Sequence, residues 1–142
     1  MQLSSCFQLI LFTMISVTSG PGSAHEAPGQ NPNPLEPCPG TPNCHIAEIA
    51  FSERPELVFD KLVQALRSTG AESVSPEPGR LYVAAVYKIP LFGYRDDVTA
   101  QVVSGENGET TLFIRSASRV GHSDLGVNQR RVKRILNTLQ KL

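Results

Sequence analysis

One stretch of this sequence, residues 115–131, carries most of the side chains that could do chemistry, and it reads R-S-A-S-R-V-G-H-S-D-L-G-V-N-Q-R-R. Serine, arginine, histidine, aspartate and asparagine are packed more densely here than elsewhere in the chain. The stretch begins as the end of a predicted strand and closes as the start of a predicted helix. A helix N-terminus can bind an anion, because its free N–H groups, the helix dipole and a nearby guanidinium all favour negative charge.

The anion-binding hypothesis assigns seven residues to a ligand site: Arg115, Ser116, Ser118, Arg119, Asp124, Asn128 and Arg131. Asp124 counts against a bound anion unless its carboxylate caps the helix. A second interpretation makes the same side chains a buried network, in which an arginine pairs with Asp96, Asp97 or Asp124. The spacing of Asp124, Asn128 and Arg131 would stack them on one side of a helix. Ser116 and Ser118 would face them, because they share strand parity with apolar neighbours.

A hydrolytic site is the alternative for the same loop. Ser118, His122 and Asp124 supply the residue types of a nucleophile, a base and an acid. Three residues so close together on one turn rarely reach the in-line geometry of a triad, and no Gly-x-Ser-x-Gly elbow is present. The sequence therefore favours a non-enzymatic binding or accessory module without a cofactor, and a hydrolase remains the second hypothesis.

Two patterns raise the question of a metal. Cys38, Cys44, His45 and His122 could supply zinc ligands, but the Cys-x5-Cys-His spacing is unusual for zinc. Asp96 and Asp97 could hold a divalent ion only across a bulge, because adjacent strand residues point to opposite faces. We expect no metal site, and we expect Cys38 and Cys44 to form a disulfide, because they are the only cysteines left once an export signal is removed.

The N-terminal residues are typical of an export signal. Residues 9–17 form an apolar run too short to cross a bilayer, and small residues precede a predicted cleavage after Ala24. We therefore expect residues 1–24 to be a signal peptide and the mature protein to be periplasmic or extracellular. An uncleaved N-terminal membrane anchor is the alternative. Residues 25–43 are rich in proline and are predicted to be a disordered linker.

Residues 44–142 are predicted to form one α+β domain. Its strands are expected in residues 46–51, 81–89, 98–102 and 111–118, with a turn at 76–79. Helices are expected from about Pro55 to Gly70 and from Leu125 to Leu139, where apolar residues recur at helical spacing. The result is a small antiparallel sheet of about four strands with two helices packed on one face.

Charge is distributed unevenly along the chain. From Arg115 onwards there are seven Lys or Arg and one acid, a balance of 7 − 1 = +6, while the preceding residues carry six basic and twelve acidic groups, or 6 − 12 = −6. The outer face of the last helix should carry Arg130, Lys133, Arg134 and Lys141. We expect at most weak, salt-sensitive contact of this face with anionic membranes, and no nucleic-acid partner.

Three motifs resemble domain-of-unknown-function family 1499: C-P-G-T-P-N-C at residues 38–44, Asp96-Asp97-Val98 after an aromatic loop, and the whole of residues 115–131. The resemblance spans Cys38 to the C-terminus. It implies an envelope-directed bacterial or plastid-related protein, and it brings no substrate or catalytic residues with it. The sequence thus predicts an exported module that binds an anionic small ligand or an envelope partner.

Overall fold

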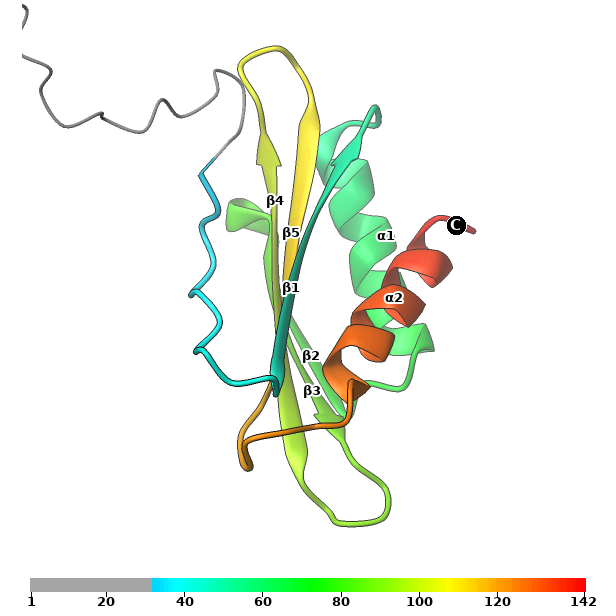
Figure 1. The fold of residues 1–142 in the computed structure, drawn as a ribbon. Coiled ribbons are helices and arrows are strands. Elements are labelled where there is room, and N and C mark those ends of the chain that lie inside the picture. Colours follow the sequence, from blue (N-terminus) through cyan, green and yellow to red (C-terminus); the bar gives the residue numbers. More distant parts are fainter. Residues whose placement is uncertain (1–31) are drawn as a thin grey trace, which may run out of the picture.

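The computed structural model describes residues 32–142 and shows a five-stranded antiparallel sheet with two helices (Figure 1). The strands are β1 (Cys44–Phe51), β2 (Ser73–Glu77), β3 (Tyr82–Lys88), β4 (Arg95–Ser104) and β5 (Thr110–Ser118). They lie in the order β1-β5-β4-β3-β2. The predicted α+β class and antiparallel sheet are confirmed, with five strands in place of about four.

The additional strand is β2, part of which the sequence assigned to a turn. Pro76 pairs with Val83 of β3, so the strand continues through the first proline of the predicted turn. This is possible because β2 lies at the edge of the sheet, where an absent N–H breaks no ladder hydrogen bond. The chain turns only afterwards, in the short 3-10 helix η1 (Pro78–Arg80).

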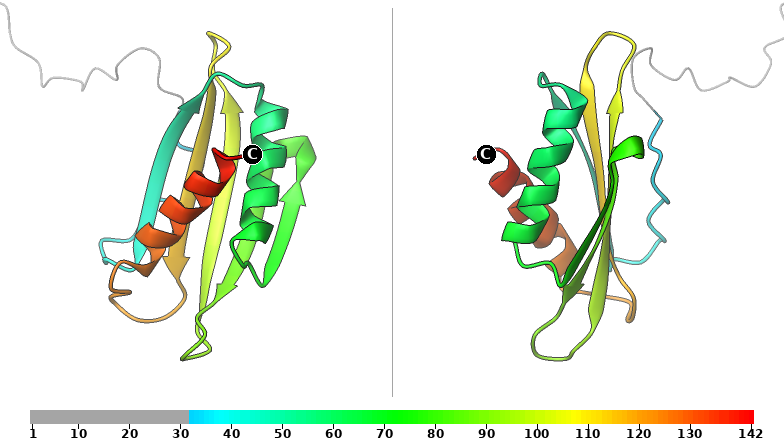
Figure 2. Two further views of the ribbon diagram at one scale, coloured as in Figure 1. Left: turned by 90° about the vertical axis from the view of Figure 1, so that its right-hand side faces the viewer. Right: turned by 180° about the vertical axis from the view of Figure 1, so that it is seen from behind.

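Both helices, α1 (Pro55–Ser68) and α2 (Val127–Leu139), cover the same face of the sheet, as predicted (Figure 2). Helix α1 begins with a proline, whose missing N–H has no partner at that position anyway, and Gly70 follows its end with φ +91°. It buries Val58, Leu62 and Leu66 at helical spacing. These side chains pack against the helix-facing residues of the sheet, and this layer is the hydrophobic core.

Helix α2 begins later than predicted. Leu125 was expected in its apolar stripe, but it has a φ of 52° and is 86% exposed, so that assignment was wrong. Gly126, with φ 77°, precedes the first helical residue, Val127. Asp124 therefore lies before the helix and does not stack on it. The rest of the stripe is as predicted, with Val132, Ile135 and Leu139 buried.

Residues 32–43, here called the strap, run along the opposite face of the sheet (Figures 1 and 2). Leu35 of the strap is only 8% exposed, and Phe113, which points to this face by strand alternation, is fully buried. The predicted disulfide between Cys38 and Cys44 is present and joins the strap to the first residue of β1.

The predicted signal peptide, residues 1–24, lies outside the described residues, and so do residues 25–31 of the predicted linker. Proline-rich composition predicted a tether for the linker, and its last twelve residues form the strap. No helix within residues 32–142 combines the length and the apolar character needed to cross a membrane.

Candidate functional site

Five polar side chains from β4, β5 and α2 form one hydrogen-bonded cluster, here called the Asn128 network: Asp96, Ser116, Ser118, Asn128 and Arg131. The Oδ1 atom of Asn128 accepts from Ser116 Oγ at 2.6 Å and from Arg131 Nη1 at 2.7 Å. Its Nδ2 atom donates to Ser118 Oγ and to the Asn43 carbonyl of the strap, both at 2.9 Å. The buried amide is therefore fully satisfied.

The register of the sheet and the period of α2 assemble this network. Asp96 lies opposite Ser118 in the ladder between β4 and β5, and both face the helices. Asn128 and Arg131 are one helical turn apart on α2, and both bond to Ser116 of β5. The prediction that Ser116 and Ser118 face residues of the last helix is confirmed. The prediction that Asp124 stacks on that helix is wrong, because the helix begins at Val127.

Arg131 carries the only buried ion pair among residues 32–142. Its Nη2 atom donates to Asp96 Oδ2 at 2.6 Å, and Asp96 is only 2% exposed. The guanidinium also lies over the ring of Tyr87, with 4.9 Å between its central carbon and the ring centroid. Burial raises the pKa of Tyr87, although a hydrogen bond with Thr69 and the charge of Arg131 act in the opposite direction.

Asp124 caps α2 from outside the helix. Its Oδ1 atom accepts the N–H of Gly126 at 2.9 Å, and its Oδ2 atom accepts the N–H of Asn128 at 2.6 Å. Partial burial favours the neutral acid, but these hydrogen bonds outweigh it and place the pKa of Asp124 below its ordinary value. The carboxylate thus occupies the helix N-terminus where the sequence suggested a bound anion.

Replacement of Asp124 by asparagine is expected to reduce the acid sensitivity of the fold. Because the folded-state pKa is lowered, the carboxylate contributes stability above its unfolded pKa of about 3.9, and this is lost as pH falls through the folded pKa. We expect the variant to lose about 1 kcal/mol or less at pH 7, and nothing at pH 2. Urea unfolding from pH 7 to 2 measures the difference. Glu106→Gln, in the β4–β5 turn, is the control, and an equal effect there would contradict the capping role.

The other two arginines of the predicted site lie away from the network. Arg119 forms two hydrogen bonds with Asp97, at 2.9 and 2.8 Å, and this pair is exposed. Arg115 points to the strap side, where its Nη2 atom lies 3.7 Å from Glu36 and its buried Nε atom has no hydrogen-bond partner. Strand alternation and the end of β5 separate these two arginines from Asn128, so the structure does not bring all seven residues of the predicted site together.

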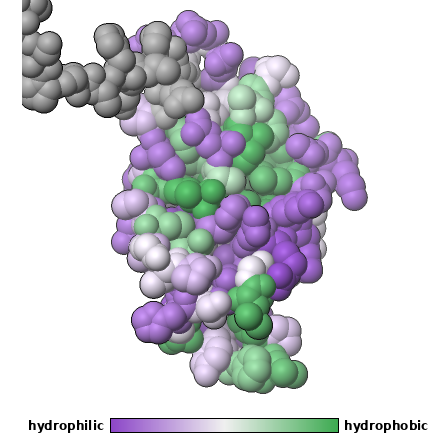
Figure 3. Space-filling view, viewed as in Figure 1, coloured by the Kyte–Doolittle hydropathy of each residue, from purple (hydrophilic) through white to green (hydrophobic). Residues whose placement is uncertain are grey.

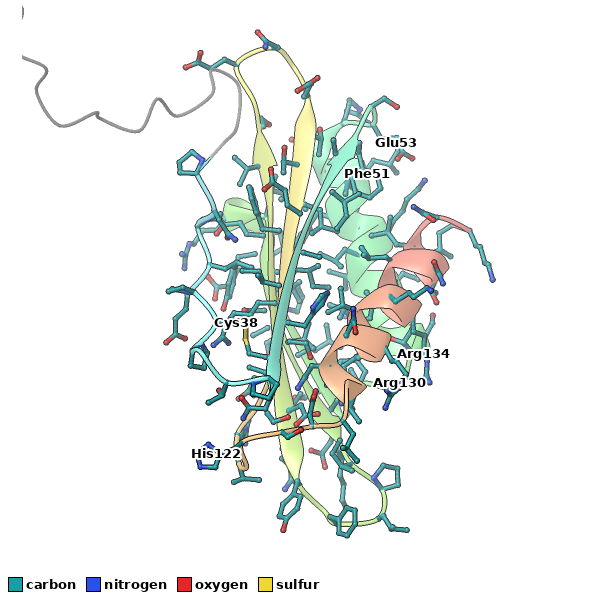
Figure 4. All side chains as sticks on the ribbon, viewed as in Figure 1. Cys38, Phe51, Glu53, His122, Arg130 and Arg134 are labelled. Carbon is teal, nitrogen blue, oxygen red and sulfur yellow. A yellow bond between two sulfur atoms is a disulfide. The ribbon has the colours of Figure 1, made fainter. Side chains whose placement is uncertain are left out.

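The hydrolase and metal hypotheses find no assembled site among residues 32–142. None of the hydrogen bonds there joins Ser118, His122 and Asp124, and His122 is exposed at the lower end of the molecule (Figure 4). The disulfide takes up both cysteines that zinc would need. No group of three or more His, Cys, Asp or Glu side chains is placed to hold a metal ion within the described part of the chain.

An open pocket of about 510 Å³ lies at the end of the sheet, between the β3–β4 loop and the β5–α2 loop. Its wall is mainly apolar and includes Ile89, Phe92, Tyr94, Val120, Leu125 and Val127. Four polar residues also line it: Asp96, Ser118, Ser123 and Asp124. This cavity is here called the apolar pocket. Because Asp96 and Ser118 belong to both, the Asn128 network lies directly beneath it.

A second pocket of about 440 Å³, here called the basic pocket, lies beside the first and shares Ile89 and Val127 with it. Four cationic side chains line it: Lys88, Arg130, Arg131 and Arg134. Figure 4 shows Arg130 and Arg134 projecting from the outer side of α2. The helical pattern predicted Arg130 and Arg134 on a basic face of the last helix, but no pattern in the sequence predicted that Lys88 lies beside them. The aromatic loop at residues 90–94 was the one feature of the sequence that could have indicated these pockets, because Phe92 and Tyr94 line the first and Pro90 lines the second.

The comparisons with known proteins identify the family. A family model described as Protein of unknown function (DUF1499) matches residues 30–139, and the chain belongs to this family. No curated protein matches the chain.

Solved structures show where the fold recurs. The di-domain ARO/CYC StfQ from the steffimycin biosynthetic pathway is similar with a TM-score of 0.52 at 10% identity, over 68% of this chain. The match spans only 44% of the StfQ chain. Protein CV1439 from Chromobacterium violaceum is matched over 71% of this chain and 97% of its own, at 13% identity and a TM-score of 0.43. At such identities the likeness to StfQ concerns the fold alone.

Proposed function

We propose that this domain is a non-enzymatic binding module whose ligand is an anion with an apolar part. The observation that carries the proposal is the shared wall of the two pockets: Ile89 and Val127 line both. A ligand lying across this wall would bury its apolar part against Phe92 and Val120 and present its negative group to Lys88 and Arg134. Largely apolar pockets with a few convergent polar groups are the usual form of small-molecule sites.

The predicted ligand residues divide into three roles in this proposal. Ser118 and Asp124 line the apolar pocket, and Arg131 lines the basic pocket, so these three can touch a ligand. Ser116 and Asn128 are buried beneath and hold the pocket in shape through their hydrogen bonds. Arg115 and Arg119 lie elsewhere and take no part in binding.

Export of the protein is part of the same proposal. The Cys38–Cys44 disulfide is typical of a chain that folds in an oxidising compartment, because cytosolic thiols are kept reduced. The predicted signal peptide in residues 1–24 agrees with this. The ligand would then be encountered in the periplasm or outside the cell.

Binding of octyl phosphate, below its micelle concentration, tests the ligand class. We expect it to bind at least about tenfold more tightly than inorganic phosphate, because burial of a few methylene groups contributes about 1.4 kcal/mol or more. Lys88→Gln combined with Arg134→Gln is expected to weaken octyl phosphate binding roughly five- to tenfold. Isothermal titration calorimetry measures these affinities.

The matched control removes two other cations that make no ion pair among residues 32–142, Arg54 and Lys141. Arg54→Gln combined with Lys141→Gln changes net charge equally, so it separates local recognition from the overall field. An equal loss in both double variants, or no preference for octyl phosphate over inorganic phosphate, would refute the proposed ligand class.

A further inference from the structure

Exposed apolar side chains gather at one end of the molecule. Five large ones, here called the apolar tip, project there from the β3–β4 and β5–α2 loops: Leu91, Phe92, Tyr94, Val120 and Leu125. Leu91 and Leu125 are 85% and 86% exposed, and the rings of Phe92 and Tyr94 stack at 5.9 Å. Figure 3 shows apolar residues at the lower end of this face, below a polar region. An exposed apolar cluster of this kind marks an interaction surface.

Three basic side chains next to the apolar tip have no acidic partner in the part of the chain that the structure describes. Lys88, Arg130 and Arg134 line the basic pocket beside the β3–β4 loop, and none forms an ion pair within the described residues. The acids of this end are engaged: Asp96 pairs with Arg131, Asp97 with Arg119 and Glu72 with Arg95. Asp124 is the exception, and its carboxylate is turned to the backbone of α2.

The opposite end of the molecule is acidic. Glu106 and Glu109 lie in or beside the β4–β5 hairpin, and Glu56 lies in the first turn of α1. None of the three forms an ion pair among residues 32–142. In Figure 1 this hairpin is at the top and the β3–β4 loop is at the bottom. The domain therefore has an acidic end and an end that combines apolar groups with free cations.

We propose that the apolar tip docks onto a bilayer that contains anionic lipids. Leu91 and Phe92 enter the headgroup region, while Lys88, Arg130 and Arg134 approach the lipid phosphates. Apolar and aromatic side chains bordered by cations are the combination that binds membrane surfaces, and each basic residue near an anionic surface adds to the attraction. The acidic hairpin is repelled by the same surface, so the charge separation fixes which end approaches.

A bilayer is favoured over a protein partner by the form of the surface. The tip is narrow, because the β3–β4 loop projects beyond the sheet and the β5–α2 loop lies beside the sheet's end, whereas a stable protein interface needs a broad complementary face. The docking surface overlaps the proposed ligand site, because four of the five residues of the apolar tip line the apolar pocket. Leu91 lines neither pocket, so variants at Leu91 test docking separately from ligand binding.

Vesicle sedimentation of the full chain tests the docking. Each variant is compared with wild type, so any contribution of residues 1–31 is common to both. Wild type is expected to bind vesicles of phosphatidylglycerol and phosphatidylcholine more strongly than phosphatidylcholine alone, and less strongly at high salt. Leu91→Ser combined with Phe92→Ser is expected to lower the partition coefficient about tenfold or more. Lys88→Gln with Arg134→Gln should lower it as well, and Arg54→Gln with Lys141→Gln should lower it less.

The orientation has its own readout, because the chain contains no tryptophan. Leu91→Trp is expected to show a blue-shifted emission on anionic vesicles, and Asn107→Trp, in the β4–β5 hairpin, is expected to show none. Equal shifts at both positions, equal losses in the two charge variants, or a tip variant that binds like wild type would overturn the proposal. The single variant Leu91→Ser should keep its affinity for octyl phosphate, so failure of docking and failure of ligand binding remain distinguishable.

Discussion

Replacement of Asp96 by alanine is expected to lower the free energy of unfolding by about 3–5 kcal/mol. The carboxylate is 2% exposed and accepts a hydrogen bond from Arg131 at 2.6 Å. Its removal leaves a buried guanidinium without a counter-ion, and the cost of that unpaired charge exceeds the net value of the pair. Urea unfolding at pH 7 measures the change.

The neighbouring residue provides the control. Asp97 also pairs with an arginine, but the pair is exposed, so Asp97→Ala should cost about 1 kcal/mol or less. If Asp96→Ala does not fold, its combination with Arg131→Met keeps the test open, because the double variant holds no unpaired charge and should be more stable than Asp96→Ala alone. Equal losses for Asp96→Ala and Asp97→Ala would contradict the account of the buried pair.

Strand alternation could predict much of this site from the sequence. Ser116 and Ser118 alternate with Arg115 and Ala117, so the serines had to share the face of Leu112 and Ile114 once that face was buried. The same rule places Arg115 on the other face. A single ligand site that contains both Arg115 and the serines is therefore inconsistent with strand alternation, because Arg115 and the serines point to opposite faces of the sheet.

The misplaced residues lie where no period applies. Leu125 fits the apolar stripe by counting back from Val132, but Gly126 adopts the left-handed conformation and ends the helical count. Arg119 follows the end of β5, where the backbone no longer fixes the direction of a side chain. Pro76 in β2 and Pro78 in η1 together resemble a turn in the sequence, and only the edge position of β2 permits Pro76 within that strand.

The pockets could not be predicted because they are formed between loops distant in sequence. The β3–β4 and β5–α2 loops lie side by side only because β4 and β5 pair in the register that sets Asp96 opposite Ser118. Hydrophobic periodicity contains no information on such pairing. The aromatic residues of the first loop were visible, but their exposure was not, and exposure is what distinguishes a binding surface from a core segment.

Replacement of Asn128 by alanine is the second large effect, and we expect a loss of about 1–3 kcal/mol in the free energy of unfolding. The amide makes four hydrogen bonds, and its removal takes one partner from each of the Ser116 and Ser118 hydroxyls and from the Asn43 carbonyl. The carbonyl then keeps only the backbone N–H of Ser118, and the Ser116 hydroxyl only the guanidinium of Arg131. Because Asn128 joins α2 to both the strap and β5, we also expect faster proteolysis within residues 32–43.

The matched control is Asn137→Ala, on the exposed side of the same helix, which should change stability by no more than a few tenths of a kcal/mol because alanine is the better helix former. The two variants differ only in whether the lost amide was buried and fully bonded. A loss for Asn128→Ala no larger than for Asn137→Ala would show that water replaces the amide at no cost, and the site would then be an open polar pocket in place of a sealed network. If Asn128→Ala is destabilised but its strap is cleaved no faster than that of wild type, the lost stability comes from the contact between α2 and β5 and not from the strap.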